Sequence, residues 1–144
     1  TTLHLVHPLG FSIDERHVRR AGLDYWPLVT IEEHPSFAQL RETYPQGEFF
    51  YATTKAPRGY CEVQFPPDAF LVFGKETKGL PEELLKANED RAVRIPMLDD
   101  IRSLNLSNSV AVAVYEGLRQ TGFDNMRKAS DYLTGLLPDG SRYE

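Results

Sequence analysis

Residues 69–88 read AFLVFGKETKGLPEELLKAN, a stretch that passes from an apolar run through two glycines into a helix-favouring segment. The run at 69–74 carries hydrophobic residues at successive positions, which is typical of a strand covered on both faces in a parallel sheet. Pro81 is tolerated in the first turn of a helix, and the two glutamates after it complement the helix dipole. The stretch therefore predicts a strand, a turn and a helix over 81–88.

The two glycines of this stretch have different expected roles. Gly74, at the end of the strand, allows another group to approach the backbone closely, and Gly79 can adopt a positive φ just before the helix. The spacing matches neither the dinucleotide fingerprint G-x-G-x-x-G nor a Walker-type phosphate loop. A generic nucleotide-binding α/β protein is therefore disfavoured.

Further strand-sized apolar runs and helical patterns flank this unit. Strands are expected at 3–6, 48–53 and 92–97, and helices at 14–22 and 35–44. The alternation predicts an α/β fold with a mostly parallel sheet, formed as a single domain over 1–144, with ligands at the carboxyl ends of the strands. Residues 55–68 form an irregular loop or a short edge element, because Pro66 and Pro67 oppose a central strand. Residues 124–144 are expected to form a loosely held tail or one short helix.

Composition limits the possible partners. The 144 residues carry a net charge of −5 and a pI near 5.4, which argues against a broad basic surface for indiscriminate nucleic-acid binding. A local basic patch and scattered solvated charges both stay open. The longest apolar run is VAVAVY at 110–115, far below the roughly 18 residues that cross a bilayer. We expect no membrane partner and a cytoplasmic location, which the single Cys61 also fits.

The histidines do not predict a metal site. His4, His7, His17 and His34 are scattered through the N-terminal quarter, with no Cys, Asp or Glu at ligand spacing. We therefore expect no metal in this chain.

Residues 94–120, RIPMLDDIRSLNLSNSVAVAVYEGLRQ, combine a cluster of Ser and Asn side chains with a strongly apolar helix. Ser107 or Asn108 can cap that helix, so the other small polar residues are surplus to capping. Val112 and Tyr115 fall off the main apolar stripe, so two faces of the helix are apolar. One face covers the sheet, and the other is covered either by a partner subunit or by the core of the same chain.

Three strand-end loops together predict a site: ATTK at 52–55, FGKETKG at 73–79 and IPMLDDIRSLNLSN at 95–108. They contain no Ser-His-Asp signature and no carboxylate pair at telling spacing. Residue types alone do not name the reaction at this site.

The stretch LVFGKETKGLP followed by RIPMLDDIRSLNLSNSVAVAVYEGLRQ resembles the second and third motifs of the SPOUT-superfamily RNA 2′-O-methyltransferases of the SpoU/TrmH type. RRAGLDYW and FFYATTK upstream are most similar to the TrmL-type branch, which methylates the ribose of the tRNA wobble nucleotide. The resemblance extends from Thr1 to about Phe123. It implies a Rossmann-like parallel-sheet fold with a C-terminal deep trefoil knot, a rare exception to the rule against threaded chains.

The resemblance also implies a cofactor and an assembly. The cofactor is S-adenosylmethionine, held mainly by backbone groups in the three loops, and no metal takes part. The family forms homodimers through the knot helices, and its substrate here is tRNA. The implied cofactor-binding residues are Ala52, Thr53, Gly74, Glu76, Ile95, Met97, Ser103 and Leu104.

Fewer residues support the catalytic assignment, because the family's first motif, N-x-G-N-x-x-R with its proton-handling Arg, is not in the given sequence. We expect a missing N-terminal strand and helix, and an inactive chain without them. The resemblance leaves Asn105, Ser107 and Tyr115 as the residues near the reacting ribose. The candidates for phosphate contacts are Arg19, Arg20 and Lys55. The alternatives are an inactive RNA-binding or assembly module and a methyltransferase for another tRNA position or for ribosomal RNA.

Overall fold

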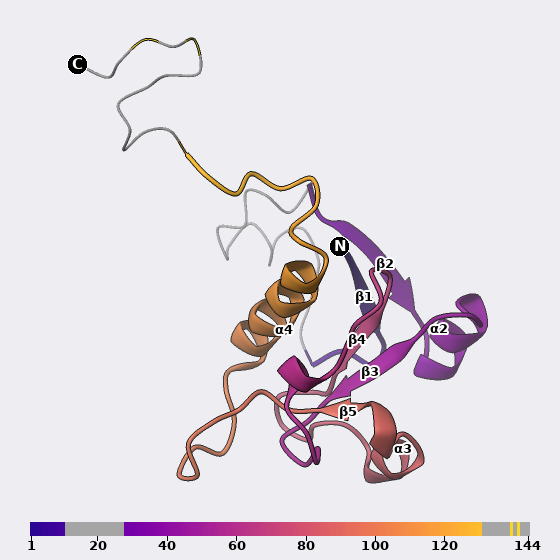
Figure 1. Ribbon diagram of the computed structural model, residues 1–144. Coiled ribbons are helices and arrows are strands. Elements are labelled where there is room, and N and C mark those ends of the chain that lie inside the picture. Colours follow the sequence, from indigo (N-terminus) through magenta and orange to yellow (C-terminus); the bar gives the residue numbers. More distant parts are fainter. Residues whose placement is uncertain (11–27, 131–138, 140, 142–144) are drawn as a thin grey trace.

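The computed structural model describes residues 1–10 and 28–130, together with positions 139 and 141 (Figure 1). Its helices and strands, in chain order, are β1 (Thr2–Val6), β2 (Thr30–His34), α2 (Phe37–Thr43), β3 (Phe49–Ala52), the 3-10 turn η2 (Tyr60–Glu62), β4 (Phe70–Phe73), α3 (Glu82–Ala87), the 3-10 turn η3 (Glu89–Arg91), β5 (Ala92–Val93) and α4 (Leu106–Gln120). The helix expected at 14–22 lies outside the described residues.

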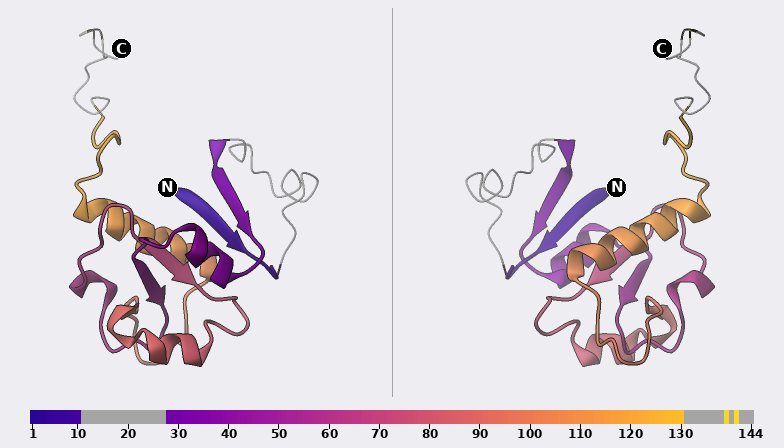
Figure 2. Two further views of the ribbon diagram at one scale, coloured as in Figure 1. Left: turned by 90° about the vertical axis from the view of Figure 1, so that its right-hand side faces the viewer. Right: turned by 90° about the vertical axis from the view of Figure 1, so that its left-hand side faces the viewer.

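All of the described strands pair in parallel, as predicted. β1 and β2 form one pair, and β4, β3 and β5 form a three-stranded sheet in that order. Figure 2 shows the β1–β2 pair set beside the larger sheet. The carboxyl ends of its three strands are aligned, because Ala52 pairs with Phe73 on one side and with Val93 on the other. The chain segments that follow β3, β4 and β5 therefore leave the same edge.

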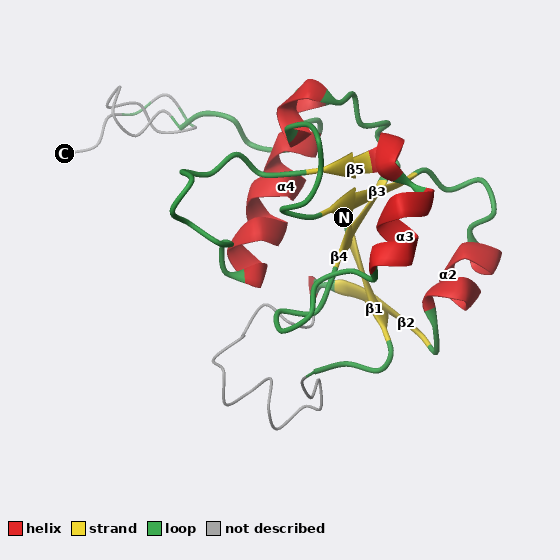
Figure 3. Cartoon of the chain, turned by 90° about the horizontal axis from the view of Figure 1, so that it is seen from below, coloured by secondary structure: helices red, strands yellow, loops and turns green. Residues whose placement is uncertain are grey.

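The larger sheet is covered on both faces. Phe49 and Tyr51 of β3 pack against Leu40 of α2 and against apolar residues of α3. The residue between them, Phe50, points the other way and packs on Phe65. Figures 1 and 3 show α4 on one side of the sheet and α2 and α3 on the other. This two-sided burial explains the successive apolar positions in the strand sequences.

α4 is fixed to the loop before β4 by one side chain. Gln120 Nε2 donates to the Val63 carbonyl at 2.8 Å, and the Phe65 amide donates to Gln120 Oε1 at 2.8 Å. Glu116, which is buried, accepts from both Gln120 and Arg119. The C-terminal turn of α4 is thus held against a segment more than fifty residues earlier in the chain.

One strand was missed by the predictions, and another was predicted to be too long. β2 was not predicted, because TIEEH has a single large apolar residue; among the described strands it pairs with β1 alone. The strand expected at 92–97 ends at Val93. Beyond it, the Arg94 amide donates to the Arg58 carbonyl and the Arg94 carbonyl accepts from the Tyr60 amide, so Arg94 forms an isolated parallel bridge with Gly59 outside the sheet. Pro96, which has no amide proton, prevents regular pairing further on.

Helix ends and loops follow the sequence more closely. α2 begins after Ser36, whose Oγ accepts from the Gln39 amide at 3.2 Å. The irregular segment expected at 55–68 holds only the short η2 turn. Residues 123–130 contain no helix, and most of the expected tail lies beyond the described residues. Within the part of the chain that is described, no helix is long and apolar enough to cross a membrane.

Candidate functional site

The site predicted from the sequence lies where three loops leave the aligned ends of β3, β4 and β5. The green loops of Figure 3 follow these strand ends. In open α/β sheets ligands bind beyond the carboxyl ends of the strands. Parallel pairing thus places the starts of the three loops, which are far apart in sequence, at one edge of the sheet.

The loop after β4 is built from backbone. A Cβ on Gly74 would lie 2.1 Å from the Gly79 carbonyl carbon and 2.4 Å from the Leu80 amide nitrogen, so only glycine fits. The Gly79 amide donates to the Lys75 carbonyl at 2.7 Å, and Gly79 has a φ of 66°. Both glycine predictions are confirmed, with one refinement: the group that approaches Gly74 is the loop's own backbone. Glu76 at the loop's tip is exposed.

The loop after β3 starts with two bonds that fix Thr53. Its amide donates to the Val93 carbonyl at 2.9 Å, and its Oγ1 accepts from the Lys55 amide at 3.2 Å. A hollow of about 310 Å³ begins here and continues along α3; its lining residues are Thr53, Lys55, Pro57, Glu82, Leu85, Lys86, Glu89 and Ala92. Thr53, which lines the hollow, and Ala52 before it are both half-buried.

Lys55 forms an ion pair across this hollow. Its Nζ lies 2.5 Å from Glu82 Oε1, and both side chains are 62% exposed. The hydrogen bond from Lys55 lowers the pKa of Glu82 below its ordinary value. The predicted phosphate-binding lysine is therefore accessible, but its charge is shared with a carboxylate. Arg19 and Arg20, the other two candidates, lie outside the described residues.

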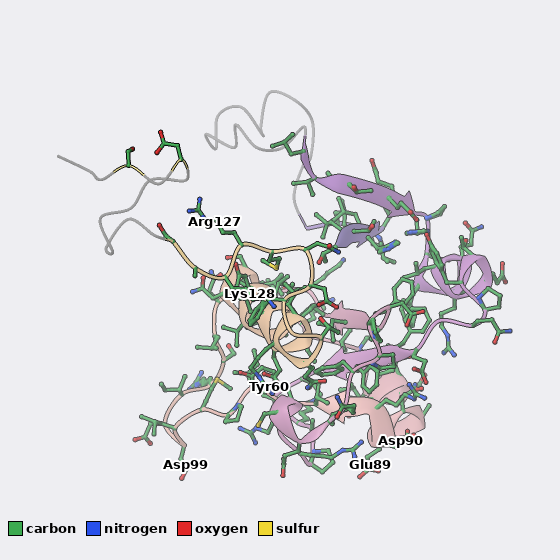
Figure 4. The ribbon with its side chains drawn as sticks, turned by 45° about the horizontal axis from the view of Figure 1, so that its top comes forward. Tyr60, Glu89, Asp90, Asp99, Arg127 and Lys128 are labelled. Atoms are coloured by element: carbon green, nitrogen blue, oxygen red, sulfur yellow. The ribbon has the colours of Figure 1, made fainter. Side chains whose placement is uncertain are left out.

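The loop after β5 is the longest of the three and is open. Ile95 and Met97 are half-buried, whereas Ser103 and Leu104 are exposed. The backbone amides of these four residues donate to no residue that the structure describes. Figure 4 shows Asp99 at the far end of this loop, pointing away from the body of the protein. The amides of Ile95 and Met97, close to the end of β5, are available to a polar ligand.

Asn105 caps α4, which corrects the expected cap. Its Oδ1 accepts from the amides of Ser107, at 2.9 Å, and Asn108, at 3.3 Å. The Ser107 Oγ also donates to this oxygen, at 2.6 Å. Ser107 and Asn108 were predicted as caps, but they lie inside the first turn. Asn105 and Ser107 therefore lie side by side at the end of the loop, where both take part in the cap; their catalytic role stays a prediction.

Tyr115 is not brought to this place. It lies ten residues beyond Asn105, which is about 15 Å along the helix axis. Its side chain is 57% exposed, and its ring lies 6.1 Å from that of Phe123. Within one chain, Tyr115 therefore belongs to a different surface from Asn105 and Ser107.

Two features were missed by sequence reasoning. Gln120, which fixes α4, bonds to residues 55 and 57 positions away, and no local pattern marks it. His4, Glu32 and His34 lie together on β1 and β2 although they are distant in sequence. The cluster depends on the pairing of β1 with β2, and the role of Gln120 depends on the packing of α4 against the loop before β4.

Comparison with known proteins decides the family. The model of the SpoU rRNA methylase family matches residues 1–115, most of the chain. The chain belongs to the SpoU rRNA methylase family. It is 48% identical over 142 residues to the putative tRNA (cytidine(34)-2′-O)-methyltransferase of Listeria innocua, covering 96% of this chain and 84% of that protein.

Solved structures of similar proteins agree with the fold. A putative RNA methyltransferase from Bacillus anthracis is 41% identical with a TM-score of 0.83, covering 90% of this chain and 84% of that one. A structure described as giving insight into 2-OH methylation of C/U34 on tRNA is 41% identical with a TM-score of 0.77, covering 85% and 80%. The α/β fold with parallel sheets and the methyltransferase family are thereby confirmed.

Proposed function

We propose that this protein is an S-adenosylmethionine-dependent tRNA 2′-O-methyltransferase that acts on the ribose of the wobble pyrimidine, as a single domain in the cytoplasm. The observation that carries the proposal is the high identity, over nearly the whole chain, to a relative named for cytidine 34. Its site is proposed at the three loops, at the edge where α/β sheets bind ligands.

The chemistry of the loops fits S-adenosylmethionine, the methyl donor of this family. The cofactor carries a nucleoside and a charged amino-acid end, and both need hydrogen-bond partners. The amides of Ile95, Met97, Ser103 and Leu104, which bind no described residue, supply donors, and the loop at Gly74 supplies a rigid backbone wall. We assign Ala52, Thr53 and Glu76 to the same pocket.

When bound, the cofactor supplies a methyl group that is already activated by the sulfonium charge. The protein's remaining task is to align the ribose 2′-hydroxyl and to help remove its proton. Asn105 Oδ1 is occupied by the cap, so its Nδ2 and the Ser107 hydroxyl oxygen are the groups left to face a ribose. We assign both residues to orienting the ribose.

Tyr115 acts across a homodimer in this proposal. Leu98, Ile101, Leu104, Val112 and Tyr115 expose apolar surface along α4 and the loop before it. A second copy of the chain that covers this surface brings Tyr115 near the partner's loops, which one chain alone does not do. The trefoil knot implied by the resemblance is part of the same proposal, since its helices form the family's interface.

For the tRNA, we assign Lys55, Arg19 and Arg20 to phosphate contacts. Lys55 is exposed beside the hollow that starts at Thr53. An acidic protein that binds one folded RNA needs only a small basic patch, because phosphate contacts fix position and orientation.

The test is methyl transfer by the product of the complete reading frame. Labelled S-adenosylmethionine is incubated with total tRNA and, separately, with ribosomal RNA, and the modified nucleoside is located by mass spectrometry. Label in a 2′-O-methylpyrimidine at tRNA position 34 supports the proposal. Label in ribosomal RNA, the substrate for which the family is named, or at another tRNA position, would contradict the assigned substrate. Cofactor binding without any transfer would favour the inactive RNA-binding module.

A further inference from the structure

A cluster of metal-ligating side chains lies on the β1–β2 pair, away from the three loops. The register of this pair places His4 opposite Glu32, and His34 follows two residues further along the same face of β2. All three side chains therefore project from one face of the pair. No part of the proposed methyl transfer uses them.

The three ligand atoms form a compact triangle. His4 Nδ1 lies 3.0 Å from His34 Nε2 and 3.5 Å from Glu32 Oε2, and His34 Nε2 lies 3.7 Å from the same oxygen. Tetrahedral Zn²⁺, with ligand bonds near 2.0–2.1 Å, needs ligand atoms separated by about 3.3 Å. The mean of the three observed separations is close to that value.

We propose that His4, Glu32 and His34 bind a divalent cation of the zinc class, through His4 Nδ1, His34 Nε2 and Glu32 Oε2. Two imidazoles and one carboxylate are a ligand set that suits zinc, with water in the fourth position. We expected no metal from the sequence because only residues close together along the chain were considered as ligands. Strand pairing creates this site from positions about thirty residues apart.

The surroundings favour a built site over a chance meeting of surface groups. The side chain of His34 is 8% exposed and that of His4 is 15% exposed, while Glu32 at 41% leaves a path for an ion. Tyr44 OH donates to Glu32 Oε2 at 2.5 Å and so orients the carboxylate, as supporting groups do in metal sites. The ring of Phe70, 5.2 Å from that of His4, covers one side.

A bound ion would join β1 to β2 directly. The pair has its own ladder but lies outside the hydrogen-bonded sheet of β4, β3 and β5. Because a metal that binds the folded state adds its binding free energy to stability, the ion should raise resistance to unfolding. The role we infer is structural.

The test compares Glu32→Gln with a control on the same strands. The full protein is freed of metal with a chelator, and Zn²⁺ binding is measured by calorimetry, with Co²⁺ as a spectroscopic probe of tetrahedral geometry. Glu32→Gln keeps the size of the side chain and should fold. His7→Ala is the matched control, because the exposed His7–Glu33 pair is also a histidine–carboxylate pair but lies outside the cluster.

The expected result is one zinc ion per wild-type chain, a tetrahedral Co²⁺ spectrum and a higher unfolding temperature with zinc. His7→Ala should behave like the wild type. Glu32→Gln should lose more affinity than the roughly 10–100-fold that loss of a supporting partner costs, and Tyr44→Phe should fall within that range. Absence of stoichiometric binding by the wild type, or equal affinity in a Glu32→Gln protein with wild-type circular dichroism, would overturn the proposal and leave a histidine–histidine hydrogen bond alone.

Discussion

The loop after β4 and the helix α4 hold their shapes by different means. The loop is fixed by backbone: Gly74 packs directly on the peptide at Gly79, and side chains such as Glu76 point into solvent. α4 is fixed by side chains at both ends, by Asn105 at its start and Gln120 at its end. A backbone-fixed loop leaves its side chains free for ligands, whereas a helix fixed by side chains has fewer of them to spare. Substitutions should therefore act differently in the two regions.

The largest effect is expected for Gly74→Ala. The new Cβ would meet backbone atoms that cannot move without breaking the loop. We expect a loss of about 3 kcal/mol of unfolding free energy, the upper end of the usual cost of overpacking a core. We also expect no measurable cofactor binding. Urea denaturation and calorimetry with S-adenosylmethionine check both. Gly10→Ala is the control, since no atom of the described residues lies within 4 Å of the position of its Cβ, and it should match the wild type. Tolerance of Gly74→Ala would show that the loop is not backbone-fixed.

Gln120→Ala tests the far end of α4. It removes two hydrogen bonds to the segment at Val63 and Phe65 and leaves their backbone groups unpaired. We expect a loss of about 1–3 kcal/mol in unfolding free energy, with cofactor affinity changed much less than by Gly74→Ala. Gln120→Glu is a useful companion, because it keeps the acceptor for the Phe65 amide but loses the donor to Val63. An unchanged urea midpoint in Gln120→Ala would mean that α4 is held by apolar packing alone.

Asn105→Ala separates capping from catalysis. Loss of the cap should cost about 1 kcal/mol. Asn105→Asp keeps the capping oxygen and removes the amide that we assign to the ribose. We expect Asn105→Asp to retain stability but to lower kcat for methyl transfer, whereas Asn105→Ala lowers both. Full activity in Asn105→Asp would restrict this residue to a structural role.

Glu116 gives the stability of α4 a dependence on pH. Hydrogen bonds from Arg119 and Gln120 lower its pKa from the ordinary value of 4.5. Its contribution is therefore fully present above that value and is lost as pH falls through the lowered pKa. Between pH 7 and pH 3 the wild type should lose more stability than Glu116→Gln, by a modest amount, because Arg119 is largely exposed and screened by water. Parallel pH profiles for the two proteins would argue against this coupling.

Lys55→Ala should have the smallest effect on folding. The ion pair with Glu82 is exposed, so the unfolding free energy should change by less than about 1 kcal/mol. Binding of tRNA should weaken, and the slope of log affinity against log salt should fall by about one. Glu82→Gln, which releases Lys55 from its partner, should instead strengthen binding. Equal tRNA affinity in all three proteins would remove Lys55 from the RNA surface.

The sequence was most informative where the backbone itself decides the structure. Gly74 and Gly79, the doubly covered strands and the parallel order were all predictable, because glycine and apolar runs have strong local meaning. The motif resemblance supplied the family, which composition could not. β2 was missed because TIEEH lacks an apolar run that marks a strand, and only its pairing with β1 identifies it.

Features that depend on distant contacts were not predictable. The cap of α4 was placed two or three residues too late, since Asn105, Ser107 and Asn108 are all good caps and only the backbone angles select one of them. The roles of Gln120 and of the cluster of His4, Glu32 and His34 depend on contacts that only the tertiary structure shows. The motif resemblance grouped Tyr115 with Asn105, although Tyr115 lies more than two turns along α4 from its N-terminal cap.

Methylation of the ribose at tRNA position 34 can be measured with a tRNA in which that 2′-hydroxyl is either free or already methylated. Two otherwise identical transcripts, one with a pyrimidine 2′-hydroxyl at position 34 and one with a 2′-O-methyl group there, are incubated with the protein and labelled S-adenosylmethionine. We expect label in the free transcript and background counts in the blocked one. Equal labelling of both transcripts, or labelling of neither by a protein that binds the cofactor, would contradict this expectation.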